Sequence, residues 1–347
     1  MSELSDPPTG RNAVRLSRAV ALCAVWVVLA FGACTAWAEE PNWGSWADAA
    51  RKQHPLAGSV YDTRFGITLR MDGRGPGFDF TIVLLGEIHD NPTHHRARAW
   101  IVENMAASRR DRPPAVVFEQ IQADQQAALD QFGQLKGSDG NPPGSDDLFR
   151  LLEWEASGWP AALIYKPLFD AVIASRLPFY AGSPPRERAR AVAREGESVL
   201  SREERTRLRL DDPMTQLQLE ALQADLRGSH CGLLPESALA GMSAAQRYRD
   251  AYLADALLAA AQKHGSAILI AGNGHVRSDR GVPWYLRLRA PRTRAVSLLL
   301  IEVEDGRTDP ATYVPRDPDG ERAADYLVFT PRGERSDPCA QLRHRKP

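Results

Sequence analysis

Short apolar runs, each bounded by turn residues, recur along the chain. They occupy residues 80–85, 115–118, 177–180, 267–271 and 295–303, and they are rich in Val, Ile, Leu and Phe. Runs of this length with little polar alternation are typical of strands that are buried on both faces. The pattern therefore predicts a mostly parallel sheet that other elements cover on both sides.

Helical patterns lie between these runs. Residues 92–105 begin with proline and follow Asn91, whose side chain suits a helix cap. Residues 242–264 carry Ser243 and Gln246 at the spacing of a capping box. Because strands and helices alternate, we expect an α/β fold with a mostly parallel sheet flanked by helices.

The same pattern divides the 347 residues into segments. A helical insert interrupts the alternation and is expected to form a lid or side lobe. The predicted segments are a signal peptide (1–38), a lead-in (39–75), the α/β domain (76–303, with the insert at about 184–264) and a tail (304–347) that is loop-like except at 326–329.

The N-terminus has the layout of a secretory signal. Arg11, Arg15 and Arg18 precede an apolar run at 19–31, and the small residues of an A-x-A site follow at 36–38. The run is shorter than the roughly 20 residues of a membrane span, which favours cleavage after residue 38 over a retained anchor. We therefore expect an exported, periplasmic protein.

Export changes what the cysteines imply. The segment ending at Cys34 resembles a lipoprotein box with an atypical Phe, so a lipid on Cys34 is the alternative to cleavage after residue 38. Cys231 and Cys339 remain after either cleavage, and an oxidising compartment favours a disulfide between them over two free thiols.

Composition excludes several classes of partner and enzyme. The net charge is −1, with 43% hydrophobic and 25% charged residues, so no basic surface predicts nucleic acid or anionic lipid as a partner. The pair Gly272 and Gly274 lacks the third glycine of a dinucleotide site, and no P-loop or G-x-S-x-G elbow occurs.

Polar residues follow three of the predicted strands. Gly-x-x-His occurs twice, ending at His89 and at His275, and Glu119 follows a third strand. In open α/β sheets ligands bind beyond the carboxyl ends of the strands, where glycine allows close approach. The three side chains suit a divalent metal or acid–base chemistry, and the alternative is that they cap their own loops.

An aromatic segment lies between the second and third strands. It holds Trp154, Trp159 and Tyr165 within a dozen residues. Aromatic residues at this spacing suit a protein core. They also suit a flat apolar ligand such as a porphyrin, with Tyr165 able to ligate ferric iron.

In combination these motifs resemble the ChaN family of haem-binding uptake proteins, which share a superfamily with the Tiki proteases and erythromycin esterase. Each piece alone is weak, but the ordered set is specific. The matching pieces are LGEIHDN (85–91), FE (118–119), Trp159 with YKP (165–167), AQ (245–246) with RD (249–250), and AGNGHVR (271–277) followed by Asp279, Gly281, Val282 and Pro283.

The resemblance implies an exported bacterial protein of haem or iron uptake, commonly a lipoprotein, that forms homodimers around haem. It places haem at the strand edge with a tyrosine as iron ligand. Carried onto this chain, it implies Tyr165 as the ligand, Arg277 as partner of a propionate, and His89, His275, Asn273 and Trp159 as further haem-binding residues. Leu253–Ala254 stands where members usually have Met-Ala.

The superfamily's metal-dependent branch implies an alternative function. In that interpretation the protein is a hydrolase, an esterase or protease, in which His89, Glu119 and His275 hold Mn, Co or Zn. Glu87, or Glu119 if it is not a ligand, would be the general base. A metal-free esterase with a histidine base is a third possibility.

Overall fold

The computed structural model describes residue 47 and residues 50–70, 80–136, 142–337, 339 and 340. The predicted signal peptide and Cys34 lie outside these residues. No helix in the described part of the chain is both long and apolar enough to cross a membrane.

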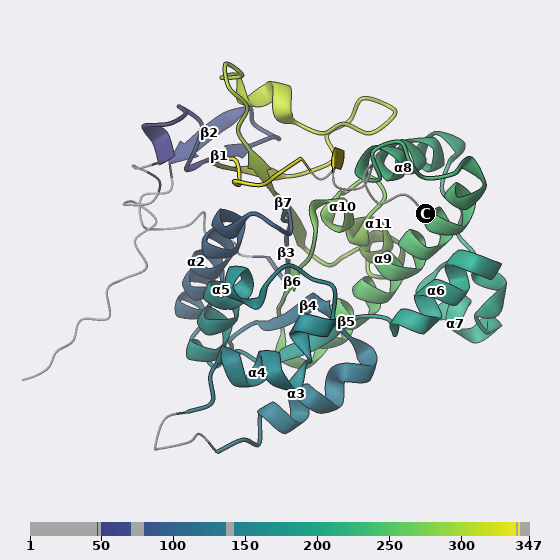
Figure 1. The fold of residues 1–347 in the computed structure, drawn as a ribbon, viewed down its shortest axis with the longest axis horizontal. Coiled ribbons are helices and arrows are strands. Elements are labelled where there is room, and N and C mark those ends of the chain that lie inside the picture. Colours follow the sequence, from purple (N-terminus) through teal and green to yellow (C-terminus); the bar gives the residue numbers. More distant parts are fainter. Residues whose placement is uncertain (1–46, 48–49, 71–79, 137–141, 338, 341–347) are drawn as a thin grey trace, which may run out of the picture. The chain divides into compact units, whose positions relative to one another are not determined.

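Within these residues eight strands form one sheet in the order β2-β1-β8-β7-β3-β6-β4-β5 (Figure 1). The six strands from β8 to β5 are parallel, and β1 and β2 add an antiparallel edge. The predicted α/β class with a mostly parallel sheet is confirmed. The strands are β1 (Ser59–Asp62), β2 (Ile67–Arg70), β3 (Ile82–Leu85), β4 (Ala115–Gln122), β5 (Phe179–Ser183), β6 (Ala267–Ile270), β7 (Ala295–Glu302) and β8 (Tyr326–Thr330).

Helices cover both faces of this sheet. They are α2 (Pro92–Ser108), α3 (Gln126–Phe132), α4 (Ser145–Leu151), α5 (Ala162–Ala174), α6 (Arg186–Glu195), α7 (Arg202–Leu208), α8 (Gln216–Ser229), α9 (Glu236–His264), α10 (Asn273–Val276) and α11 (Val282–Arg289). Short 3-10 turns occupy Ala123–Gln125, Trp154–Ala156, Glu197–Val199 and Pro310–Tyr313.

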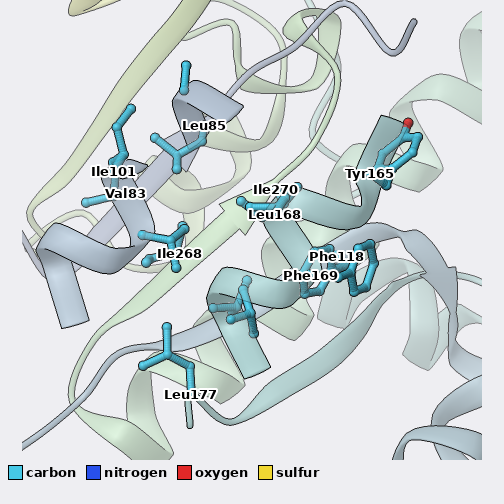
Figure 2. Packing of buried hydrophobic residues seen from close by; sticks show 14 of the residues in the cluster. Val83, Leu85, Ile101, Phe118, Tyr165, Leu168, Phe169, Leu177, Ile268 and Ile270 are labelled. Atoms are coloured by element: carbon cyan, nitrogen blue, oxygen red, sulfur yellow. The ribbon is translucent and has the colours of Figure 1, made fainter. Parts of the chain in front are cut away.

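Alternate residues of the central strands face two different layers. Val83 and Leu85 of β3 pack with α2 and α5, as Figure 2 shows from close by. Ile82 and Leu84 point the other way and pack with α9 and α11. Because successive side chains of a strand alternate between its faces, an all-apolar run is required where both faces are covered.

The start of α2 follows its capping signal. The Asn91 side chain accepts hydrogen bonds from the backbone N–H groups of Thr93 (2.8 Å) and His94 (3.3 Å), and proline occupies the first turn. These bonds satisfy donors that have no partner inside the helix.

The predicted start of α9 is wrong by six residues. The helix begins at Glu236, after Pro235, so Ser243 lies buried inside it and caps nothing. Residues 236–242 are mostly helix formers, and they extend the helix past the apparent capping box. The predicted end is confirmed, since Gly265 terminates the helix with φ of 86°.

The sheet extends beyond the predicted domain at both ends. Strands β1 and β2 come from the predicted lead-in, and β8 comes from the predicted tail, where residues 326–329 were the expected exception. Val60 of β1 pairs with Val328 of β8, so the two ends of the domain close one edge together. The insert also differs from a separate lobe, because α9 packs directly on the sheet.

One covalent bond joins the tail to the helical insert. The structure links Cys231, in the turn between α8 and α9, to Cys339 by a disulfide across 108 residues of chain. Such a bridge stabilises the fold mainly because it removes conformations from the unfolded chain.

We expect the substitution Cys339→Ser to lower the free energy of unfolding by about 2–4 kcal/mol, as is usual for a bridge that closes a long loop. Denaturant unfolding with and without a reducing agent measures the effect. The double variant Cys231→Ser/Cys339→Ser should be insensitive to reductant, and an equal stability of reduced and oxidised wild type would contradict the prediction.

Candidate functional site

Three strands bring their polar residues to one edge of the sheet. In the pairing register Leu85 of β3 lies beside Ile270 of β6, and Ile270 lies beside Phe118 of β4. Glu87, Glu119 and Gly272 follow these three paired residues, so they lie at about the same height along the strand direction. This edge is where parallel α/β sheets bind their ligands.

Glu87 is the centre of a buried hydrogen-bond network. Its Oε1 atom accepts from His89 Nδ1 (2.6 Å), Gln120 Nε2 (2.9 Å) and the Tyr165 hydroxyl (3.2 Å). Its other oxygen forms an ion pair with Arg98 of α2. Glu87 is 2% exposed, so the protein rather than water satisfies this carboxylate.

The arginine in this network is wholly buried. Burial lowers the pKa of Arg98 to about 9, and its Nε and Nη1 atoms have no hydrogen-bond partner in the described residues. Its Nη2 atom donates to His95 Nδ1 (2.8 Å), while His95 Nε2 donates to the backbone oxygen of His89 (2.9 Å). Burial lowers the pKa of His95 to about 4, so this ring is neutral and both of its nitrogens are engaged.

His89 differs from the residues beneath it because it reaches the surface. Its side chain is 36% exposed, and its ring meets that of Trp159 edge-on at 4.9 Å. Burial lowers its pKa, and Nδ1 is held by Glu87. The Nε2 atom makes no hydrogen bond within the described part of the chain.

A second network lies under the end of β6. His275 binds Asp250 through Nδ1 (2.6 Å) and Glu119 through Nε2 (3.1 Å). Glu119 also accepts from Arg249 (2.5 Å) and from the backbone N–H of Gly272 (2.7 Å). Burial alone would lower the pKa of His275, but the two carboxylates outweigh it and raise that pKa to about 9.

This network does not provide the predicted metal site. Both ring nitrogens of His275 face carboxylates, and Glu119 is committed to His275, Arg249 and a backbone amide, so a metal at this position would have to displace these contacts. No group of three His, Cys, Asp or Glu side chains in the described ranges could hold a metal ion, so His89, Glu119 and His275 do not form one. Glu87, the predicted base, is also enclosed.

A pocket of about 390 Å³ opens beside these networks. Its walls come from the ends of β4 and β5, the loop at 157–159, and helices α6 and α9. Trp159 and Met242 give it apolar surface, and Arg186, Arg190 and Arg249 give it positive charge. The indole N–H of Trp159 donates to the backbone oxygen of Gln120 (3.0 Å), which fixes the ring in place.

Three other predicted haem-binding residues lie elsewhere. Tyr165 is fully buried, and its ring packs 4.0 Å from that of His95. Asn273 bonds the backbone of β7, and Arg277 is paired with Asp279 at 3.0 and 2.9 Å. None of the three lines the pocket. His89 and His275 do not line it either, so Trp159 is the one predicted haem-binding residue among the pocket's lining residues, and His89 reaches it only through its ring contact with Trp159.

Sequence reasoning missed several residues of the site. Arg98 had a usable signal, because a cation on the buried face of a helix requires a partner. Arg186 and Arg190 lie four residues apart and share a helix face, which is the second usable signal. Gln120 had no such signal, since only the fold brings its partner to it. Asp250 belonged to the matched RD pair at 249–250, but the sequence gave it no role.

The glycine of the first Gly-x-x-His motif is required for space. A Cβ atom on Gly86 would lie 2.2 Å from Asn273 Oδ1, 2.8 Å from Val276 Cγ2 and 3.2 Å from the backbone oxygen of Leu298. At Gly274, by contrast, a Cβ atom would meet nothing within 4 Å.

We therefore expect Gly86→Ala to lower the free energy of unfolding by about 1–3 kcal/mol, the usual cost of overpacking. The matched variant Gly274→Ala should unfold within about 0.5 kcal/mol of wild type, since it creates no clash. Urea unfolding of both variants measures the difference, and equal destabilisation by the two would refute the assignment of close packing to Gly86.

His275 makes stability depend on pH in a defined direction. Its folded pKa of about 9 exceeds the ordinary value of 6.5, so its contribution is complete below pH 6.5 and is lost as the pH rises through 9. We expect a loss of up to about 3 kcal/mol over this window, which His275→Gln should abolish. Unfolding curves between pH 6 and 10 test this, and an identical slope in the variant would contradict it.

Comparison with solved structures shows the fold. The structure reported as cofacial haem binding to ChaN of Campylobacter jejuni matches with a TM-score of 0.55 and 17% identity, over 78% of this chain and 95% of that chain. An erythromycin esterase variant in its open conformation matches with a TM-score of 0.40 and 13% identity, over 75% and 92%. No curated protein sequence matches the chain at a significant level.

The family match covers more than half of the chain. Residues 79–286 fit the family model described as haem-binding uptake, Tiki superfamily, ChaN. This range contains both Gly-x-x-His motifs, both buried networks and the pocket. The chain belongs to the ChaN family of haem-binding uptake proteins in the Tiki superfamily.

Proposed function

We propose that this protein binds haem at the carboxyl edge of its sheet, in the pocket between Trp159 and helices α6 and α9. The observation that carries the proposal is that one pocket combines a fixed aromatic ring with three arginines. Haem makes both demands, because its macrocycle is flat and apolar and its two propionates are anionic.

The apolar part of the pocket suits the macrocycle. Trp159 is held by its hydrogen bond to the backbone of β4, so its ring is available without reorganisation. Further apolar surface comes from Met242 and from three alanines of α6 and α9, namely Ala189, Ala193 and Ala245. Burial of the porphyrin against these groups would supply most of the binding free energy.

The charged part of the pocket suits the propionates. Arg186 and Arg190 lie on the exposed face of α6, and Arg249 approaches from α9. Guanidinium groups bind carboxylates through paired hydrogen bonds, which are stronger than neutral ones. The predicted propionate partner Arg277 does not line the pocket, and its pair with Asp279 is largely buried. Arg190 also has a carboxylate partner, Glu187, but that pair is exposed on α6 and is easily exchanged, so we assign this role to the α6 pair.

We also propose that the protein acts outside the cytoplasm, in haem or iron uptake. The N-terminal pattern of a signal peptide supports export, and so does the Cys231–Cys339 disulfide, since such bonds persist in oxidising compartments. A periplasmic location and lipid on Cys34 stay predictions from the N-terminal sequence and the resemblance, and a homodimer around haem stays a prediction from the resemblance.

A haemin titration of the purified protein, followed by absorbance, tests the proposal. We expect a saturable, stoichiometric shift of the Soret band, and absence of saturation would overturn haem binding. Arg190→Ala should raise the Kd about tenfold, since a charge-assisted hydrogen bond contributes on the order of 1.5 kcal/mol or more.

Arg194→Ala is the matched control for this experiment. Arg194 lies on the same helix one turn further on, its side chain is 62% exposed, and it does not line the pocket. Equal loss of affinity in the two variants would mean that general charge, rather than this pocket, attracts haemin.

A further inference from the structure

We propose that the protein has a second ligand site, in a pocket between the ends of β3, β7 and β8, and that this site takes a short peptide with free amino and carboxyl ends. The inference goes beyond haem binding, since this pocket shares no lining residue with the pocket beside Trp159. Its position in the sheet, a buried donor without a partner and two unpaired charges of opposite sign carry it.

The pocket has a volume of about 810 Å³ and is built by four segments of the chain. Ile88 follows β3, residues 301–305 end β7 and continue beyond it, and residues 331 and 332 follow β8. His54 comes from the segment before β1, which runs antiparallel to β8 and so begins at the same edge of the sheet. The pocket therefore opens at the carboxyl edge of the parallel strands.

This position is a switch point of the sheet. Strands β7 and β3 are parallel neighbours, and the chain leaves β3 toward β4 on one side and leaves β7 toward β8 on the other (Figure 1). Open α/β sheets bind ligands where neighbouring strands connect in opposite directions, because a crevice forms between the diverging connections. Strands β6 and β4 form a second pair of this kind, and β4 contributes to the pocket of the proposed haem site. Each switch point thus has a pocket of its own.

His54 gives the wall of this pocket a buried donor without a partner. The residue is 6% exposed, and its Nδ1 atom accepts a hydrogen bond from the backbone N–H of Leu56 (3.2 Å). A neutral imidazole that accepts at Nδ1 carries its proton on Nε2. That Nε2 atom has no hydrogen-bond partner in the part of the chain that the structure describes. Since buried polar groups in native proteins are nearly always hydrogen-bonded, a ligand oxygen would supply the acceptor that His54 lacks.

Two charged side chains of the lining are unpaired. Arg332 and Asp305 form no side-chain hydrogen bond and no ion pair with any described residue. Glu302 and Arg335, by contrast, are already paired with each other at 2.5 Å. A ligand with one anionic and one cationic group would therefore pair with both available charges and leave the existing ion pair intact.

A short peptide with both ends free carries this pair of charges. Its carboxylate suits Arg332, because a guanidinium binds a carboxylate through two parallel hydrogen bonds, and the same carboxylate can accept from His54 Nε2. Its ammonium suits Asp305, and Glu304 provides a second carboxylate whose pair with Arg307 is exposed.

The size and the apolar lining favour a peptide over a single amino acid. A cavity of about 810 Å³ lies in the range that holds drug-sized molecules, so it has room for more than one residue. Apolar surface for the peptide's side chains comes from Ala57, Ile88, Ile301, Val303 and Pro331.

The backbone on both sides of Arg332 is fixed before any ligand binds. The Asn91 side chain donates to the backbone oxygen of Pro331 (3.1 Å), and the backbone N–H of Gly333 donates to Glu302 Oε1 (2.9 Å). Binding would therefore order only side chains in this wall, which keeps its entropic cost low.

Titration of the purified protein with the dipeptide alanyl-leucine, followed by ligand-detected NMR, tests the inference. We expect saturable binding at one site. Acetylation of the amino end or amidation of the carboxyl end should each raise the Kd about tenfold, equal to roughly 1.4 kcal/mol. Absence of saturable binding, or equal affinity for all three probes, would overturn the inference.

Two variants connect each end of the peptide to its partner. Arg332→Gln should raise the Kd of alanyl-leucine about tenfold but leave that of the carboxyl-amidated probe unchanged, and Asp305→Asn should do the same for the acetylated probe. Arg322→Gln is the matched control, since Arg322 is an exposed arginine that precedes β8 and does not line the pocket. A loss in Arg322→Gln equal to that in Arg332→Gln would contradict the site.

A haemin titration of the same variants separates this inference from the proposed function. Arg332→Gln should bind haemin with the wild-type Kd, because Arg332 does not line the pocket beside Trp159. If haemin binds and alanyl-leucine does not, the peptide site fails while haem binding stands. If alanyl-leucine binds as expected and haemin does not, the proposed function fails and the peptide site stands.

Discussion

The buried ion pair between Glu87 and Arg98 is the constraint on which the candidate site depends. A guanidinium with no exposed surface has lost its hydration, and two of its nitrogens have no partner in the described residues, so Glu87 provides its principal compensation. Breaking such a pair costs about 3–5 kcal/mol, because one charge remains buried alone. The loop after β3 is consequently fixed to α2, and Gln120 and Tyr165 fix it to β4 and α5 as well.

The polar residues of the sheet edge fall into two groups. Most belong to the two buried networks and hold other side chains in place, and the others face outward. Glu87 and Glu119 each satisfy several donors, Glu87 just after β3 and Glu119 within β4. These bonds fix the members of each network, although Arg98 Nε and Nη1 and Gln120 Oε1 have no partner in the described residues, which is costly in a buried network. Part of the His89 side chain remains exposed at this edge.

The sequence predicted the centre of the fold better than its edges. The runs that form β3, β4, β6 and β7 were recognisable because both faces of these strands are buried, which demands continuous apolar residues. Strand β2 is a short edge strand with Ile67 exposed, and β1 is buried but only four residues long, with Ser59 and Asp62 at its ends, so neither has a continuous apolar run. At the candidate site, the Gly-x-x-His motifs pointed to this edge of the sheet, but they could not assign roles to individual residues. Tyr165 illustrates this, because an aromatic residue in a core and one in a pocket have the same sequence pattern.

The helical insert lines the pocket, and the tail contacts the neighbouring loop after β3. Helices α6 and α9 supply the three arginines of the pocket, whereas the sheet loops supply His89 and its supports. The tail is held to the insert by Cys339, and its Arg335 pairs with Asp90, the residue next to His89, and with Glu302 of β7. One continuous set of covalent and ionic contacts therefore runs from the turn between α8 and α9 to the loop that carries His89. The tail therefore holds the loop that carries His89 through Arg335, although it lies outside the matched family range.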